Sequence, residues 1–149
     1  TPGQIQRYMN KISGPLLDRI DIQCEITPVP FKDISKAAQG EPSAEIRKRV
    51  IRAREIQAAR FSGQKGIHCN AQMSERMIHQ YAEPDEAGIS MLRMAMERLS
   101  LSARAYNRIL KVARTIADLE GCEHVESHHL AEAIGYRTLD RGDWAERGI

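Results

Sequence analysis

The sequence predicts a mainly α-helical domain that is preceded by one helix and one strand. After residue 42 the apolar residues recur at intervals of three and four, which is the spacing of a buried helix face. Apolar and polar residues alternate convincingly only from Ile20 to Ile26, with the period of a half-buried strand. The chain has 149 residues, which is enough for one domain with a hydrophobic core.

The first elements are expected within residues 1–27. Thr1 and Pro2 are typical of a helix start, and the sequence Ser-Gly-Pro at 13–15 is expected to end that helix. The strand Ile20–Ile26 has no second strand in the chain to satisfy its backbone groups. We therefore expect a strand that has lost its sheet, with an apolar face that folds back on the helices or pairs with another molecule.

Residues 28–42 contain three prolines and a glycine and predict a linker, with one short helical turn near Asp33 to Ala38. Beyond the linker we expect five helices, each opened by a capping residue or a proline. Their expected spans are Ser43 to Phe61, Asn70 to Tyr81, Pro84 to Leu99, Ser102 to Gly121 and Ser127 to Leu139. Residues 43–140 would form one helical bundle, and residues 141–149 a flexible tail.

The charge of the chain is nearly balanced overall but uneven along its length. The formal net charge of +2 does not by itself indicate a polyanionic partner. Between residues 45 and 65, however, seven basic residues accompany two acidic ones, whereas from residue 118 onward eight acidic residues accompany three arginines. The helix after Ser43 could therefore contact a phosphate backbone directly, although it contains no base-reading motif.

The cysteines and histidines exclude some classes of protein. Three widely spaced cysteines do not make a disulfide framework and favour a reducing, cytoplasmic setting. No apolar run reaches the roughly 18 residues of a membrane span, so no membrane partner is expected. Cys122, His124 and His128 have a spacing that metal ligands can use, but histidines four apart on a helix also occur as ordinary exposed pairs. We predict no metal site, but the spacing alone does not decide whether these three residues bind a metal.

A basic face is predicted on the helix that begins after Ser102. Arg104, Arg108 and Lys111 are separated by four and three residues, so they project from one side of the helix. Most basic faces are simply solvated, but Arg104 falls in the first turn, where the helix dipole disfavours a positive charge. An anion bound at this position would meet both the guanidinium group and the free backbone amides.

Several stretches resemble one known family. GPLLDRIDI resembles the segment that closes the nucleotide-binding core of magnesium-chelatase-related AAA+ ATPases, and LSARAYNRILKVARTIADLEG resembles the sensor-2 helix of their C-terminal lid. The stretches TPGQIQRYMNKISGPLLDRID and HHLAEAIGYRTLDR are similar to the ComM-like (YifB-like) branch, and the resemblance covers nearly the whole chain. It implies that residues 1–27 are a remnant of the AAA+ core and that residues 43–140 are the helical lid.

The resemblance also implies roles for three arginines. Arg19 matches the family's arginine finger, a catalytic residue that would act in trans on the nucleotide of an adjacent subunit. Arg104 matches sensor 2 and would bind the γ-phosphate of the ATP in its own subunit. Arg108 is a further candidate for contact with this cofactor.

Cofactors and partners follow from the same resemblance. The parent protein is expected to be a ring-forming ATPase, hexameric, that uses ATP and Mg²⁺, contacts its own N-terminal AAA+ core and neighbouring subunits, and acts on DNA. This chain contains no G-x-x-x-x-G-K-[ST] loop and no apolar strand that ends in an Asp-Glu pair, so we expect the fragment to hold no cofactor and not to hydrolyse ATP. The alternative is a helical DNA-binding or protein-interaction module that is independent of nucleotide, for which Arg19 and Arg104 would be dispensable.

Overall fold

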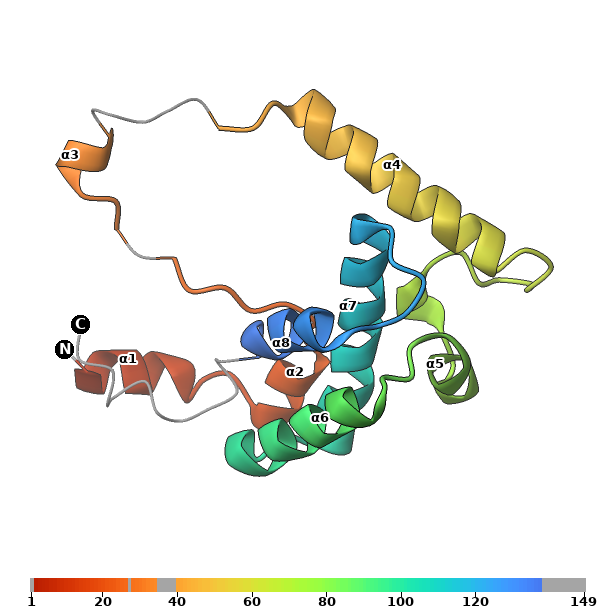
Figure 1. The fold of residues 1–149 in the computed structure, drawn as a ribbon. Coiled ribbons are helices and arrows are strands. Elements are labelled where there is room, and N and C mark those ends of the chain that lie inside the picture. The colour runs from red at the N-terminus through yellow and green to blue at the C-terminus, as the bar shows by residue number, and fades with distance from the viewer. Residues whose placement is uncertain (1, 27, 35–39, 138–149) are drawn as a thin grey trace.

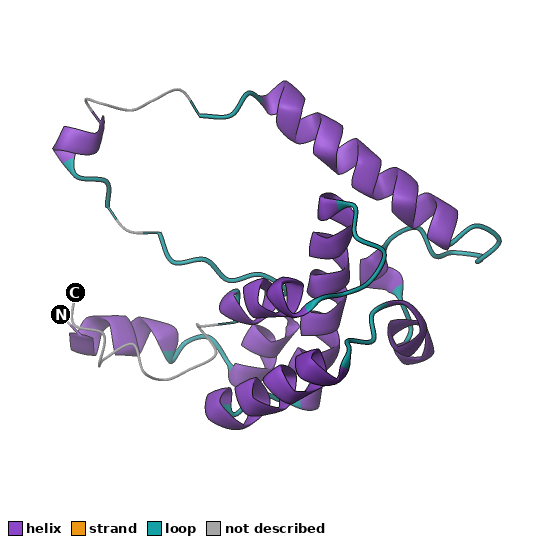
Figure 2. Ribbon diagram, in the orientation of Figure 1, coloured by secondary structure: helices purple, strands orange, loops and turns teal. Residues whose placement is uncertain are grey.

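The computed structural model describes residues 2–26, 28–34 and 40–137, which form helices joined by loops (Figures 1 and 2). The elements in chain order are α1 (Pro2–Met9), α2 (Gly14–Arg19), α3 (Phe31–Ile34), α4 (Ser43–Arg60), the 3₁₀ turn η1 (Asn70–Gln72), α5 (Glu75–Tyr81), α6 (Glu86–Leu99), α7 (Ala103–Glu120) and α8 (Ser127–Gly135). The prediction of a mainly α-helical fold is confirmed. None of the helices described is both long and apolar enough to cross a membrane. The tail expected at 141–149 lies outside the described residues.

α7 is the central helix of the fold. It packs against α8, α4, η1, α2 and α5, and α6 packs in turn on α8 (Figure 1). Ile109, Leu110 and Ala113 of α7 are completely buried and form the hydrophobic core together with Leu92 of α6 and Leu130 of α8. Because each fully buried isoleucine or leucine contributes about 1.5–3 kcal/mol relative to an exposed one, this face fixes the orientation of α7.

Local signals at both ends define α7. The hydroxyl of Ser102 accepts a hydrogen bond from the Ala105 amide at 3.2 Å, as the sequence predicted. Gly121 ends the helix with a φ of 81°, and the Cys122 amide that follows donates to the Ala117 carbonyl at 2.8 Å. A glycine is favoured here because a side chain is strained in this left-handed conformation.

The starts of the other helices differ from the predicted ones by a few residues. Ser43 lies inside α4, and the prediction that Asn70 caps a long helix is wrong because Asn70 opens only the turn η1. The true caps are Ser74 for α5 and Asp85 for α6, whose side chains accept amide hydrogen bonds from Met77 and Gly88. These shifts lie at the helix ends, which are the least certain part of a helix prediction from sequence.

The N-terminal segment departs furthest from the sequence prediction. The Ser-Gly-Pro sequence, expected only to end a helix, also begins α2, because the Ser13 hydroxyl accepts from the Leu16 amide at 3.3 Å and Pro15 occupies the first turn. Ile20–Ile26 is extended but pairs with no strand among the described residues. The polar Gln23 is buried, whereas Ile22 is 51% and Ile26 91% exposed. Within the described part of the chain, no sheet covers the apolar side. The Gln23 amide donates to the Tyr136 carbonyl just after α8 at 3.0 Å, and this bond holds the Gln23 side of the segment against the body.

A buried carboxylate joins α7 to the elements around it. Asp118 accepts two hydrogen bonds from the guanidinium group of Arg60 on α4, at 2.5 and 2.7 Å, and one at 3.1 Å from Arg114 on α7 itself. The side-chain amide of Asn70 in η1 donates to the same carboxylate at 2.8 Å. Arg114 also donates to the carbonyls of Cys122 and Glu123 at 2.6 and 2.7 Å. This cluster therefore fixes α4, η1 and the α7–α8 loop around the C-terminal half of α7.

Replacement of Asp118 tests how much the fold depends on this cluster. Asp118→Asn removes the counter-charge of the buried Arg114 and the partly buried Arg60. We expect a loss of about 3–5 kcal/mol in the free energy of unfolding, because breaking a buried pair leaves an uncompensated charge in the interior. Urea denaturation measures the change. Glu45→Gln, which breaks the exposed pair with Lys48, is the control and should leave the midpoint nearly unchanged. An unchanged midpoint for Asp118→Asn would contradict the proposed dependence.

Candidate functional site

Arg19 is the last residue of α2 and is exposed to solvent. One arm of its guanidinium group, through Nη1, donates to the Pro15 carbonyl at 2.9 Å, one turn earlier in the same helix. No described carboxylate pairs with it. The remaining donors are therefore directed to solvent, and the side chain can meet an anion supplied by another molecule.

Arg104 lies in the first turn of α7 and is also exposed. It makes no ion pair with a described residue, so its charge is uncompensated within this part of the chain. The Ser102 hydroxyl accepts a hydrogen bond from the Ala105 amide in the first turn. The other amides at the start of the helix have no partner within α7. The position therefore combines a guanidinium group with the positive end of an 18-residue helix.

The structure separates the other two bases of this face from Arg104. Arg108 donates to the Asp21 carboxylate at 2.5 Å, and Lys111 donates to the Ala71 carbonyl at 2.9 Å. Burial lowers the pKa of Lys111, and the charge of Arg108 lowers it further. Both side chains line a hollow of about 300 Å³ that Ile116 and Leu119 of α7 also line. Arg108, predicted as a further contact to nucleotide, thus forms an ion pair with Asp21 in this structure.

Arg137 is a functional candidate that the sequence analysis missed. It follows α8, is completely buried, and donates to the carbonyls of Leu17, Asp18 and Ile20 at the end of α2. It lies in the stretch HHLAEAIGYRTLDR, whose resemblance to the family assigns this arginine no role. One signal was available, because Arg137 is the first Lys or Arg after Arg114 in an acidic stretch. Its partners are more than a hundred residues away, so the spacing could not reveal them.

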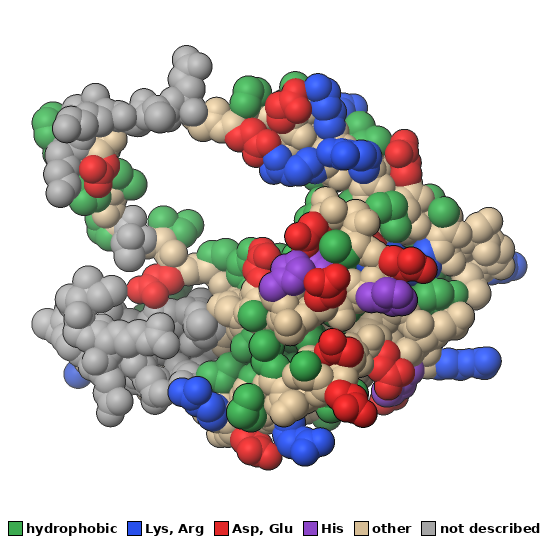
Figure 3. Space-filling view, in the orientation of Figure 1, with side chains coloured by type: hydrophobic (Ala, Val, Ile, Leu, Met, Phe, Trp, Pro, Cys, Tyr) green, Lys and Arg blue, Asp and Glu red, His purple; other side chains and the backbone are tan. Residues whose placement is uncertain are grey.

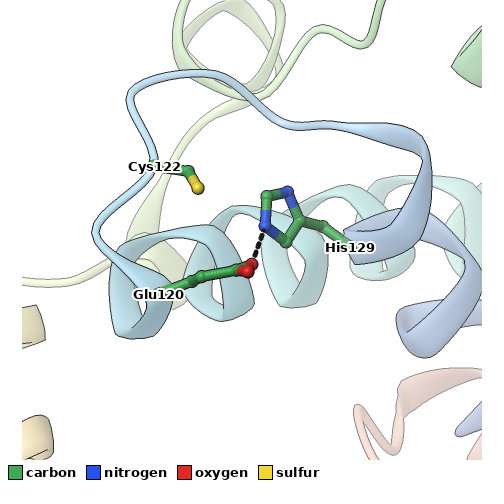
Figure 4. Close-up of side chains that lie close together, drawn as sticks. All are labelled: Glu120, Cys122 and His129. Carbon is green, nitrogen blue, oxygen red and sulfur yellow. Dashed lines mark hydrogen bonds and ion pairs between the residues drawn. The ribbon is translucent and has the colours of Figure 1, made fainter.

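Glu120, Cys122 and His129 bring a possible set of metal ligands together (Figure 4). One ligand atom from each lies within 4.8 Å of the others. This group shares only Cys122 with the set Cys122, His124 and His128 considered from the sequence. His128 approaches from the exposed side, with its Nε2 2.8 Å from the Glu120 carboxylate.

The hydrogen bonds of His129 argue against a metal at this place. Its Nδ1 accepts the Glu126 amide at 2.9 Å, so the ring proton is on Nε2, which donates to Glu120 at 2.5 Å. A metal at Nε2 would require that proton to move to Nδ1 and the helix-capping bond to break. Desolvation also raises the pKa of Cys122, which disfavours the thiolate that metals bind. The residues present fit a helix cap better than a metal site.

α4 is rich in basic residues, with Arg and Lys at six of its positions. Its N-terminal part extends away from the other helices, and Figure 3 shows its Lys and Arg side chains gathered along it. Lys48 and Arg49 pair with Glu45 and Glu41. Arg47, Arg52 and Arg54 are exposed and pair with no described acidic residue.

Comparison with known proteins identifies the family. Residues 40–137 match the family described as magnesium chelatase, subunit ChlI C-terminal, and residues 1–34 match the family described as magnesium chelatase, subunit ChlI. The chain therefore belongs to the magnesium-chelatase-related family, as the sequence motifs predicted.

Its relatives include ComM and YifB. The chain is 42% identical over 142 residues to the competence protein ComM of Haemophilus influenzae. It is 44% identical to YifB of Salmonella typhimurium and 41% identical to YifB of Escherichia coli, each over 142 residues. Each alignment covers 95% of this chain and 27% of the relative. The chain thus spans about a quarter of the length of these relatives, and the lid-like helical fold agrees with the resemblance.

The pair His128–Glu120 gives this region a pH dependence. The hydrogen bond to Glu120 raises the pKa of His128 above the ordinary value of 6.5, and the same bond lowers the pKa of Glu120. Because the pKa of the histidine is raised by folding, the stabilisation is complete below pH 6.5 and is lost as the pH rises through the raised value. The Glu120 contribution is lost in the opposite direction, as the pH falls.

An NMR titration of the His128 ring measures this shift. We expect a pKa above 6.5 in the wild-type chain and a return toward 6.5 in Glu120→Gln, because that variant removes the acceptor. Glu123→Gln is the matched control and should leave the pKa raised, since Glu123 is not among the groups that shift it. An equal effect of both variants would show that the pair is not the cause.

Proposed function

We propose that this chain supplies the helical lid and the arginine finger of a ring-forming ATPase of the magnesium-chelatase-related type. The observation that carries the proposal is the contrast between two groups of arginines. Arg60 and Arg114 are bound to Asp118 in the interior, whereas Arg19 and Arg104 are exposed with no described carboxylate beside them. These are the two positions that match the family's finger and sensor-2 motifs.

The two arginines serve different nucleotides. ATP, held with Mg²⁺ by the AAA+ core of each subunit, supplies the γ-phosphoryl group that is transferred to water. Arg19 neutralises the negative charge that develops on this group when it is bound by the adjacent subunit. Arg104 contacts the γ-phosphate in its own subunit, aided by the positive end of α7, and so makes the position of the lid depend on the bound nucleotide.

The partners of the chain follow from these roles. They are its own N-terminal AAA+ core and the neighbouring subunits of a ring, which we expect to be hexameric and cytoplasmic. The exposed apolar side of Ile20–Ile26 supports contact with a sheet of that core, because Ile22 and Ile26 otherwise remain in water. DNA is the proposed substrate of the ring. The chain alone does not hydrolyse ATP, since its sequence has no phosphate-binding loop.

A second candidate function is direct binding of DNA by α4 without nucleotide. The exposed Arg47, Arg52 and Arg54 on a helix that extends away from the body support it. Two neighbouring bases are already paired with glutamates, which lowers the effective charge of this helix. We therefore rank it below the lid and finger function.

Complementation between variants tests the lid and finger function. In the longer ring-forming protein, Arg19→Ala should lower ATP hydrolysis by about 10³-fold or more, the usual contribution of an arginine finger. Arg104→Ala should also lower it. An equal mixture of the two variants should regain hydrolysis, because the intact finger of an Arg104→Ala subunit serves the intact sensor site of an Arg19→Ala neighbour. Phosphate release measures all three samples.

The control for this experiment is Arg93→Ala, an exposed arginine of α6 that should leave the rate unchanged. Normal rates for both Arg19→Ala and Arg104→Ala would instead support a module independent of nucleotide. Two defective variants that fail to complement each other would contradict a finger that acts in trans.

Salt-dependent binding of duplex DNA to the chain tests the second candidate. If α4 contacts the backbone, changing Arg47, Arg52 and Arg54 to Gln together should reduce the slope of log affinity against log salt by about 2–3, roughly 0.9 for each lost contact. Arg93→Gln on α6 is the control and should not change the slope. Equal slopes for the triple variant and the wild type would exclude α4 as the contact.

A further inference from the structure

We propose that Arg137 fastens the finger-bearing helix α2 to the lid, so that Arg19 moves with the lid of its own subunit. The inference rests on the proposed function, in which Arg19 is the arginine finger and Arg104 senses the nucleotide. Arg137 is then a positioning residue, since it acts through the backbone of α2 and contacts no nucleotide. The consequence is a physical link between the nucleotide sensed at Arg104 and the finger presented to the next subunit.

The contacts of Arg137 are those of a buried clamp. Its side chain is completely buried after α8, and its guanidinium group reaches three carbonyls at the C-terminal end of α2. Nη1 donates to Ile20, and Nη2 lies 3.4 Å from the carbonyls of both Leu17 and Asp18. The last carbonyls of a helix lack partners within the helix and carry the negative end of its dipole. A buried guanidinium group needs such acceptors, so α2 and the end of α8 depend on each other.

Two further contacts hold the segment that follows α2. The Gln23 amide donates to the Tyr136 carbonyl at 3.0 Å, and the Gln23 side chain donates to the Leu17 carbonyl at 3.2 Å. From the other side, Arg108 of α7 binds the Asp21 carboxylate at 2.5 Å. Residues 17–23 are thus attached to both α7 and α8, although no strand pairs with them among the described residues.

These contacts connect the finger to the sensor. Arg104 and Arg108 are one turn apart on α7, and α7 packs closely on α8. When Arg104 draws α7 toward its own nucleotide, the ion pair of Arg108 moves Asp21, and Arg137 moves the end of α2. Arg19 is the last residue of that helix, so its position follows the lid. Binding of ATP in one subunit would therefore bias hydrolysis in the next one.

The first test measures the clamp itself in the 149-residue chain. Arg137→Met keeps much of the side-chain volume but removes all donors. We expect the amides of Ile20 and Gln23 to exchange their hydrogens at least about tenfold faster, because this segment opens locally while the core stays closed. The amides of Ile109 and Leu110 in α7 should keep their wild-type rates. Hydrogen exchange followed by NMR gives each rate.

Two other variants keep this test decisive. Arg93→Gln, on the surface of α6, is the control and should change none of these rates. If Arg137→Met accelerates exchange throughout the chain, Arg137→Lys decides, because it keeps a positive charge at this position but lacks the planar fork that reaches three carbonyls. Acceleration confined to residues 20–23 supports the clamp, and unchanged exchange there overturns it.

The second test places Arg137 in a functional class by complementation in the longer protein. If Arg137 positions the finger, Arg137→Met lowers ATP hydrolysis, is rescued by mixing with Arg104→Ala, and is not rescued by mixing with Arg19→Ala. A variant that merely damages its own lid shows the reverse pattern, because its finger remains intact. That reverse pattern, or normal hydrolysis by Arg137→Met, overturns the proposed link.

The two tests separate failure of this inference from failure of the proposed function. If Arg19→Ala and Arg104→Ala do not complement each other, the finger assignment is wrong, and the exchange rates alone decide whether Arg137 clamps α2. If they do complement each other but Arg137→Met is rescued by Arg19→Ala and not by Arg104→Ala, the finger assignment stands and the link through Arg137 is wrong.

Discussion

The fold depends on one buried carboxylate and the two guanidinium groups that compensate it. Asp118 is inside the protein, where an unpaired charge would be strongly destabilising, so Arg60 and Arg114 must remain beside it. Arg60 comes from α4, Asn70 of η1 donates to the same carboxylate, and Arg114 also binds the loop before α8, so this requirement fixes three elements around α7. The orientation of α7 determines in turn where Arg104 and Arg108 point.

The arginines of this chain therefore divide by environment. Since a guanidinium group stays charged under all ordinary conditions, each one must find compensation or remain in water. Arg60 and Arg114 find a carboxylate, and Arg137 finds the carbonyl end of α2. Arg19 and Arg104 remain at the surface, where their charge is available to a partner. This distribution is the basis of the proposal that Arg19 and Arg104 act on phosphate groups outside the chain.

The N-terminal segment shows how side chains can replace a missing sheet. Its backbone is held to α7 and α8 by Asp21, Gln23 and Arg137, and its apolar residues face outward. The predicted boundary between a core remnant at 1–27 and a lid at 43–140 was drawn from the sequence alone. In the structure, Arg137 donates hydrogen bonds to the carbonyls at the end of α2, so α2 is attached to the helices of residues 43–137.

The sequence by itself determined the helical fold, the ends of α7 at Ser102 and Gly121, and the family. These depend on local spacing, capping and motifs, which lie within a few residues of one another. Only the tertiary structure decided that Asp118 binds Arg60, that Arg108 binds Asp21, and that Arg137 reaches α2. Each of these contacts joins positions far apart in the chain. The sequence does not show whether the partner of a charged residue is water or a buried group. The outward turn of Ile20–Ile26 escaped prediction for the same reason, because alternation indicates two faces but does not say which one the rest of the protein will cover.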